Sequence, residues 1–241
     1  MKVTSVQARC LTIPIKFPFT EKSRTEGMLL VRVETDSGNI GFGISRDTER
    51  YAVRESINRD IAPFLLGKDP ICTEQIWEDA CWEIGMSYMS KGGAIGRAIG
   101  AVDQALWDIK GKALGEPIYR LLGGAARERV LVYTHFDGDT PEELADGGQQ
   151  LLEEGWRVIR ISPIVTEGNF NAKKAINNGI NHFEALRNRV GDEVEIIFEV
   201  HTRLTPARAI ELCNALEEFR PFFVEDPIRA ENPQSYATLR A

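Results

Sequence analysis

The stretch from residue 194 to residue 227 holds two short runs of β-branched and aromatic residues, each of which stops abruptly on an acid. An amphipathic segment separates the runs, with Thr205 placed to cap a helix and Pro206 at its first position. A strand, a helix and a second strand at this spacing predict a parallel βαβ unit. The carboxyl ends of the strands in such units open on one face, so Glu199 and Glu225 are expected on the same face.

Two further polar residues follow the acids. His201 comes two positions after Glu199, and because side chains alternate along a strand we expect it to point to the same face. Asp226 follows Glu225 and is expected to brace the turn before Pro227. Two carboxylates and an imidazole on one face predict a site for a hard divalent cation with an acid–base group beside it.

Strands and helices alternate through the whole second part of the chain. The pattern predicts strands over residues 130–135, 158–162, 194–200 and 222–224, and helices over residues 141–154, 172–190 and 205–219, with another beginning at 233. Four βα units in series are typical of a (β/α) barrel, but a closed eight-stranded barrel takes about 250 residues. We therefore expect residues 126–241 to form the N-terminal half of a barrel, in a truncated or incomplete chain or one completed by another polypeptide. A self-sufficient α/β sheet of four strands covered by helices is the alternative.

Residues 1–125 are expected to form an α+β domain, with strands first and helices after them. The turn sequence at 36–39 lies between two alternating runs and predicts a hairpin, which a preceding strand over 2–15 extends to a three-stranded meander; residues 16–26 are expected to be a loop. Helical patterns follow over residues 50–64, 72–84 and 94–114, the last closed by Gly115.

Composition excludes several classes of function. The formal net charge of −7 argues against a nucleic-acid partner, which would require a basic surface. No apolar run approaches the roughly 20 residues of a membrane span, and the N-terminus leads directly into a strand pattern rather than a signal peptide. The cysteines are scattered without metal-ligand spacing, which favours reduced thiols in a cytoplasmic protein.

Three sequence motifs carry a resemblance to a known family. They are the run from Ala98 to Gly124, the segment E-V-H-T-R-L-T-P from Glu199, and the segment F-F-V-E-D-P-I-R-A-E-N-P from Phe222. In this order they resemble the mandelate racemase branch of the enolase superfamily, and within it the mannonate, galactonate and gluconate dehydratases. The resemblance implies an α+β capping domain on a modified TIM barrel. It also implies Mg²⁺ that stabilises an enediolate, formed when a base removes the proton next to a carboxylate.

The resemblance implies a role for residues at the ends of the second, third and fourth barrel strands. Glu199, where relatives usually carry Asp, corresponds to the first metal ligand and Glu225 to the second. His201 corresponds to the histidine that donates a proton to the departing hydroxyl in the dehydratases. Arg160 and Ser162 occupy the positions of the two lysines in the K-x-K motif of racemases. Because arginine stays protonated, Arg160 is expected to clamp a carboxylate or enediolate rather than act as a base, which favours dehydration over racemisation.

Ser162 and two further residues are candidates for substrate contact. His135 ends the first predicted barrel strand on the same face, although it could equally be a loop histidine without a role. Arg203 could contact substrate or pair with a surface acid. The third acidic ligand and the base of the relatives lie on later strands, beyond residue 241.

The resemblance thus implies a Mg²⁺-dependent hydro-lyase that acts on a small-molecule sugar acid, eliminates its β-hydroxyl and gives a 2-keto-3-deoxy acid. It also implies a homo-oligomer for the full-length protein. Two alternatives stay open: a racemase or epimerase of the same superfamily, and a non-catalytic remnant that lacks the third ligand and the base.

Overall fold

The structure, a computed structural model, describes residues 1–16, 23–46, 49–84, 93–164, 168–231 and 233–240. The chain divides into two compact units, Met1–Glu128 and Arg129–Ala241. Among the described residues, no helix is both long enough and apolar enough to cross a membrane.

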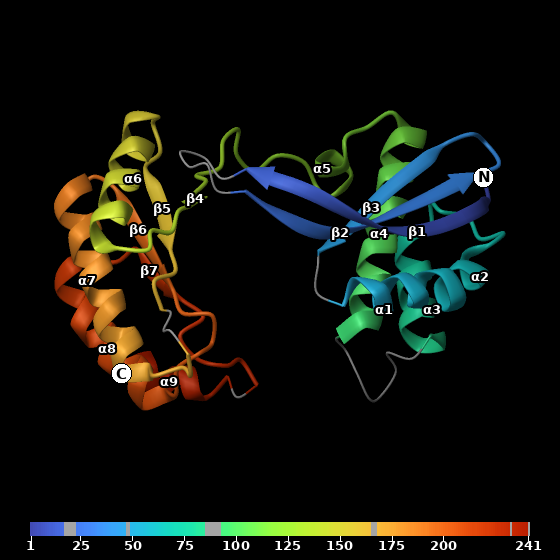
Figure 1. The fold of residues 1–241 in the computed structure, drawn as a ribbon. Helices are drawn as coiled ribbons and strands as arrows, with labels where there is room; N and C mark the ends of the chain where they lie inside the picture. Colours follow the sequence, from blue (N-terminus) through green and yellow to red (C-terminus); the bar gives the residue numbers. More distant parts are fainter. Residues whose placement is uncertain (17–22, 47–48, 85–92, 165–167, 232, 241) are drawn as a thin grey trace. The chain divides into compact units, whose positions relative to one another are not determined.

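The first unit combines an antiparallel sheet with helices, as the sequence predicts (Figure 1). Within the described residues the sheet has the order β1-β2-β3, and its strands are β1 (Val3–Lys16), β2 (Ser23–Thr35) and β3 (Ile40–Arg46). The helices are α1 (Arg50–Glu55), the π-helical η1 (Ser56–Ile61), α2 (Ala62–Leu65), α3 (Thr73–Glu83), α4 (Gly93–Leu114) and α5 (Ile118–Leu121). The loop expected over 16–26 is shorter than predicted, because Lys16 pairs with Ser23; residues 17–22 lie outside the described residues.

Helix α4 packs directly on the sheet because β3 carries glycine where the two elements meet. A β-carbon on Gly43 would lie 1.8 Å from the carbonyl oxygen of Ala101, and one on Gly41 would lie 2.0 Å from that of Ala105. The alternating residues Leu29, Val31 and Val33 of β2 are fully buried in the same core. Close approach of the helix backbone therefore requires glycine at these two positions.

Polar side chains of α4 satisfy backbone groups of β3. Asp108 accepts a hydrogen bond from the amide of Phe42 at 2.9 Å, and Gln104 accepts one from the amide of Ile44 at 3.1 Å. The amide group of Gln104 also donates to the carbonyl oxygen of Ile44 at 3.2 Å. The helix thus covers the outer edge of the strand, which would otherwise present unpaired backbone groups.

The second unit contains the predicted alternation of parallel strands and helices (Figure 1). Within the described residues its sheet has the order β4-β5-β6-β7, with every neighbouring pair parallel. The strands are β4 (Thr134–His135), β5 (Val158–Ile161), β6 (Glu195–Glu199) and β7 (Phe223–Glu225). The helices are α6 (Pro141–Glu153), α7 (Ala172–Val190), α8 (Pro206–Leu216), the 3-10 turn η2 (Glu217–Phe219) and α9 (Ser235–Arg240). This arrangement corresponds to part of a TIM barrel.

The first strand of this unit is much shorter than predicted. Residues 130–133 are irregular, and Val130 and Leu131 are each 68% exposed. The prediction of a strand over 130–135 is therefore wrong for its first four residues. The physical reason is the register: Thr134 pairs with Ile159, and β5 begins only at Val158, so residues before 133 have no strand beside them.

A buried arginine fixes the start of β6. Arg187 of α7 is 8% exposed and donates hydrogen bonds to backbone carbonyl oxygens in the segment before β6 and in the segment before β7. The acceptors are Phe219 at 3.0 Å, Gly191 at 2.8 Å, Val194 at 2.6 Å and Arg220 at 3.0 Å. The turn into β6 and the turn into β7 are therefore tied to the same side chain.

Candidate functional site

The acids predicted to share a face lie opposite each other at the carboxyl ends of neighbouring strands. Glu199 of β6 and Glu225 of β7 are register partners in the parallel pair. The side chain of Glu199 is 2% exposed and that of Glu225 is 29% exposed. Because both residues are the last of their strands, their position follows from strand alignment rather than from a loop conformation.

Arg160 of β5 joins the two carboxylates. Its neighbours Ile159 and Ile161 are buried in the core beneath the helices, so strand alternation turns the arginine to the opposite face. Its Nε donates to Oε2 of Glu225 at 2.5 Å, and its Nη2 contacts Oε2 of Glu199. Since one guanidinium group reaches both carboxylates, they lie on the same side of the sheet.

The electrostatics of Arg160 follow from these contacts. Burial acts to lower the pKa of the guanidinium, but the hydrogen bonds to Glu225 and Glu199 outweigh it and leave the pKa above its ordinary value. Arg160 therefore carries its charge at neutral pH. It cannot serve as a base, as expected from its residue type.

His201 reaches the same edge by a different route from the one predicted. Strand β6 ends at Glu199, and His201 lies beyond it in a turn where its φ is +53° and that of Thr202 is +56°. The backbone N–H of His201 donates to Oε1 of Glu199 at 2.6 Å, and its Nδ1 lies 2.9 Å from Oγ of Ser162. A left-handed turn held by Glu199, rather than strand alternation, thus directs the imidazole.

Two predicted residues remain, and His135 lies next to the carboxylates whereas Arg203 does not. Nδ1 of His135 lies 3.0 Å from Nη1 of Arg160, which places His135 with the acids. We call His135, Arg160, Ser162, Glu199, His201 and Glu225 the strand-end cluster. Arg203 lies apart from it, and its guanidinium donates to the carbonyl oxygen of Ile164 at 3.3 Å.

Asp137 is a member of this edge that the sequence analysis missed. Its Oδ1 accepts a hydrogen bond of 2.8 Å from the backbone N–H of Ser162, so it connects the segment after β4 to the end of β5. The available signal was its position two residues after His135, at the carboxyl end of a strand. The acid helps to hold Ser162, and through it the ring of His201.

The chemistry of the two acids fits a hard divalent cation, which prefers carboxylate oxygens. Glu199 and Glu225 would be the protein ligands. Within the described part of the chain, no group of three or more His, Cys, Asp and Glu residues is arranged to hold a metal ion. The strand-end cluster thus offers two carboxylate ligands, between which the guanidinium of Arg160 now provides the positive charge.

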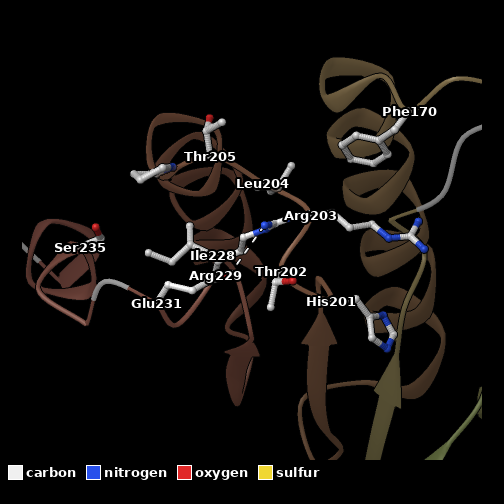
Figure 2. A pocket seen from close by; sticks show the side chains of 11 residues that line it. Phe170, His201, Thr202, Arg203, Leu204, Thr205, Ile228, Arg229, Glu231 and Ser235 are labelled. Atoms are coloured by element: carbon white, nitrogen blue, oxygen red, sulfur yellow. Dashed lines mark ion pairs between the residues drawn. The ribbon is translucent and has the colours of Figure 1, made fainter. Parts of the chain in front are cut away.

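A pocket of about 680 Å³ adjoins the strand-end cluster, and His201 belongs to both (Figure 2). Apolar walls come from Phe170, Leu204 and Ile228. Its polar lining includes His201, Thr202, Arg203, Arg229, Glu231 and Ser235. Arg229 and Glu231 lie 3.8 Å apart and are both largely exposed, so their charges face solvent at the mouth. Hydroxyl and guanidinium groups suit a small acidic molecule that carries several hydroxyls.

Family models match both units. Residues 1–123 match the mandelate racemase/muconate lactonizing enzyme N-terminal domain, and residues 143–241 match the enolase C-terminal domain-like family. Among curated proteins, a D-galactonate dehydratase family member from Pantoea ananatis is 34% identical, and one from Musicola paradisiaca is 36% identical. Each alignment covers 88% of this chain and 58% of the relative. The chain therefore spans little more than half the length of these relatives.

Solved structures agree with these matches. An enolase from Pantoea ananatis with bound D-gluconate and Mg superposes with a TM-score of 0.81 at 30% identity, covering 99% of this chain and 63% of that one. The 3,6-anhydro-D-galactonate cycloisomerase from Zobellia galactanivorans superposes with a TM-score of 0.84 at 25% identity, covering 100% and 62%. Proteins of this architecture thus include more than one reaction type.

Proposed function

Because the chain belongs to the mandelate racemase/muconate lactonizing enzyme family, we propose that it carries part of the active site of a Mg²⁺-dependent acid-sugar dehydratase. The observation that supports this proposal is the convergence of Glu199 and Glu225 on one guanidinium group at the carboxyl edge of a parallel sheet, with His201 beside them. A bound Mg²⁺ would supply electrostatic stabilisation of the negative charge that develops on the substrate carboxylate.

In this proposal Arg160 binds the carboxylate of the sugar acid. A guanidinium fork matches a carboxylate with two parallel hydrogen bonds, and its constant charge stabilises the enediolate as charge builds up on the oxygens. Lysine at the same position could lose its proton and act as a base, whereas arginine cannot. An arginine here therefore favours elimination over the two-base exchange of a racemase.

His201 is the proposed general acid. Its Nδ1 lies 2.9 Å from Ser162 Oγ, so Nε2 is the nitrogen through which the ring can give a proton to the substrate. After a base has removed the α-proton, the electron pair of the enediolate forms the Cα–Cβ double bond, and the electron pair of the breaking bond to the β-hydroxyl leaves with the oxygen. The proton from Nε2 joins that oxygen, and water departs. Ser162 and Asp137 orient the ring and touch no reacting atom in this scheme.

The proposed substrate is a small sugar acid, and the pocket next to His201 supports this class. Arg203 offers positive charge, Arg229 offers it beside the acid Glu231, and Thr202 and Ser235 offer hydroxyls, which suits a polyhydroxylated carboxylate. The D-gluconate bound to the Pantoea ananatis enzyme belongs to that class. His135, next to Arg160, is a further candidate for contact with the substrate.

A screen of sugar acids with Mg²⁺ tests this function directly. The expected product is a 2-keto-3-deoxy acid, detected as its semicarbazone, and His201→Asn should lower its rate of formation by about 10²–10⁴-fold. Arg189→Gln is the matched control, because Arg189 on α7 forms an exposed ion pair with Asp146 on α6, outside the cluster. Loss of substrate deuterium or inversion without loss of water would instead identify a racemase or epimerase.

A non-catalytic remnant is the second candidate, and the observation that favours it is the lack of a three-ligand group within the described residues. It predicts no heat on titration with Mg²⁺ and no keto acid from any substrate. Part of a dehydratase site predicts heat on titration with Mg²⁺, and keto acid only where the rest of the site is present, so calorimetry distinguishes the two.

A further inference from the structure

Arg160 occupies a position that concerns cation binding as well as substrate binding. The side chain of Arg160 is 11% exposed, and that of its partner Glu199 is 2% exposed. Two carboxylates so close together, with one of them buried, are unfavourable unless a positive charge compensates them. Among the described groups, the guanidinium of Arg160 supplies that charge to both acids.

Most of the carboxylate oxygens that a divalent cation would bind already accept hydrogen bonds within the protein. Oε2 of Glu199 and Oε2 of Glu225 both contact the guanidinium, and Oε1 of Glu199 accepts the backbone N–H of His201 at 2.6 Å. Both oxygens of the buried carboxylate are therefore engaged. On Glu199, a metal ion shared by the two acids would therefore meet only oxygens already in use, one of them the oxygen that Arg160 contacts.

We propose that Arg160 and a divalent cation compete for Glu199 and Glu225, so that cation binding releases the guanidinium from the acids. This inference rests on the proposed metal site and adds an order of binding, with the cation before the substrate. The guanidinium becomes available to a substrate carboxylate only after the cation has replaced it. Arg160 thus acts first as an internal counter-ion and then as a substrate ligand.

Calorimetric titration with Mg²⁺ at pH 8 tests the competition. Arg160→Gln removes the competing charge and is expected to bind Mg²⁺ at least about tenfold more tightly than the wild-type chain, which corresponds to about 1.4 kcal/mol. Arg160→Lys keeps the charge but loses the fork that reaches both acids, so its affinity should lie between the two. Arg189→Gln removes an exposed arginine and should bind as the wild type does.

Thermal unfolding gives a second readout that is independent of activity. Without metal, Arg160→Gln should melt below the wild-type chain because two acids lose their counter-charge. Added Mg²⁺ should then raise its melting temperature by more than it raises that of the wild type. A thermal shift that is larger in the wild type would overturn the competition.

The possible results separate this inference from the metal assignment. Equal Mg²⁺ affinity in the wild type and Arg160→Gln, or weaker binding by the variant, overturns the competition and leaves Glu199 and Glu225 as ligands. Binding that is unchanged in a Glu199→Gln, Glu225→Gln double variant overturns the metal assignment itself. No binding by any variant overturns both.

Discussion

Replacing Arg187 by methionine is expected to destabilise the second unit by about 3–5 kcal/mol. Methionine retains much of the apolar contact of the arginine stem but donates no hydrogen bond. The carbonyl oxygens that lose a donor belong to the residue after α7, the residue before β6, the last residue of η2 and the residue after η2. The substitution therefore acts on the segments that lead into the strands carrying Glu199 and Glu225.

The magnitude follows from opposing contributions. A hydrogen bond from a charged donor contributes about 1.5–3 kcal/mol, and carbonyl oxygens left buried lose this in full. Two effects reduce the total: burial of the guanidinium is itself unfavourable, as the lowered pKa of Arg187 indicates, and water can reach the more exposed turns. A net loss of a few kcal/mol remains, which is a large part of the stability of a typical domain.

Urea denaturation followed by circular dichroism measures the loss, and hydrogen exchange locates it. Amides of β6 and α7 should lose protection in the variant, whereas those of β1, β2 and β3 should keep theirs. Arg189→Gln, two residues along the same helix, should change stability by less than about 0.5 kcal/mol because its ion pair is exposed. A loss below about 1 kcal/mol for Arg187→Met, or an equal loss for the control, would refute the reasoning.

Two further predictions concern a close contact and a half-buried thiol. Gly43→Ala should destabilise the first unit by about 2–4 kcal/mol, since its β-carbon would meet the carbonyl oxygen of Ala101, whereas Gly100→Ala, with open space around it, should have no such effect in the same melting assay. Burial raises the pKa of the Cys213 thiol, so at pH 8 less of it is thiolate and alkylation should label it more slowly than the exposed Cys72. Equal labelling rates by peptide mass spectrometry would contradict the partial burial of Cys213.

The order of elements was predictable because its signals are local. Period-2 and period-3.6 patterns identified the strands and the longer helices of both units, and the thirteen-residue helix α6 and nineteen-residue helix α7 begin where the sequence indicates. The short helix α5 was not predicted, and the single helix expected over 50–64 is divided by the π-helical η1. The absence of a strand over residues 130–133 could not be predicted from such local patterns. The apolar residues of this segment suit a strand, but a strand forms only beside a partner, and β5 begins too late to provide one.

The composition of the strand-end cluster was predictable, but its internal pairing was not. Because parallel strands end at the same face, Glu199 and Glu225 lie close together whichever rotamers their side chains adopt. The left-handed turn at His201 carries no such signal, since histidine is not a residue type that favours positive φ as glycine does. It is held by the N–H bond to Glu199, which only the folded backbone makes available.

Arg160 illustrates why a residue type predicts a role only in part. Arginine at the end of β5 indicates a carboxylate clamp, but the sequence does not say whose carboxylate it clamps. In the folded chain the nearest carboxylates are those of the protein itself, 39 and 65 residues away in the sequence. A guanidinium group satisfied by internal acids binds a substrate only if something else neutralises those acids. In the proposed site, an arginine clamp beside two metal ligands makes substrate binding depend on the cation, so the binding of each can be tested through the other.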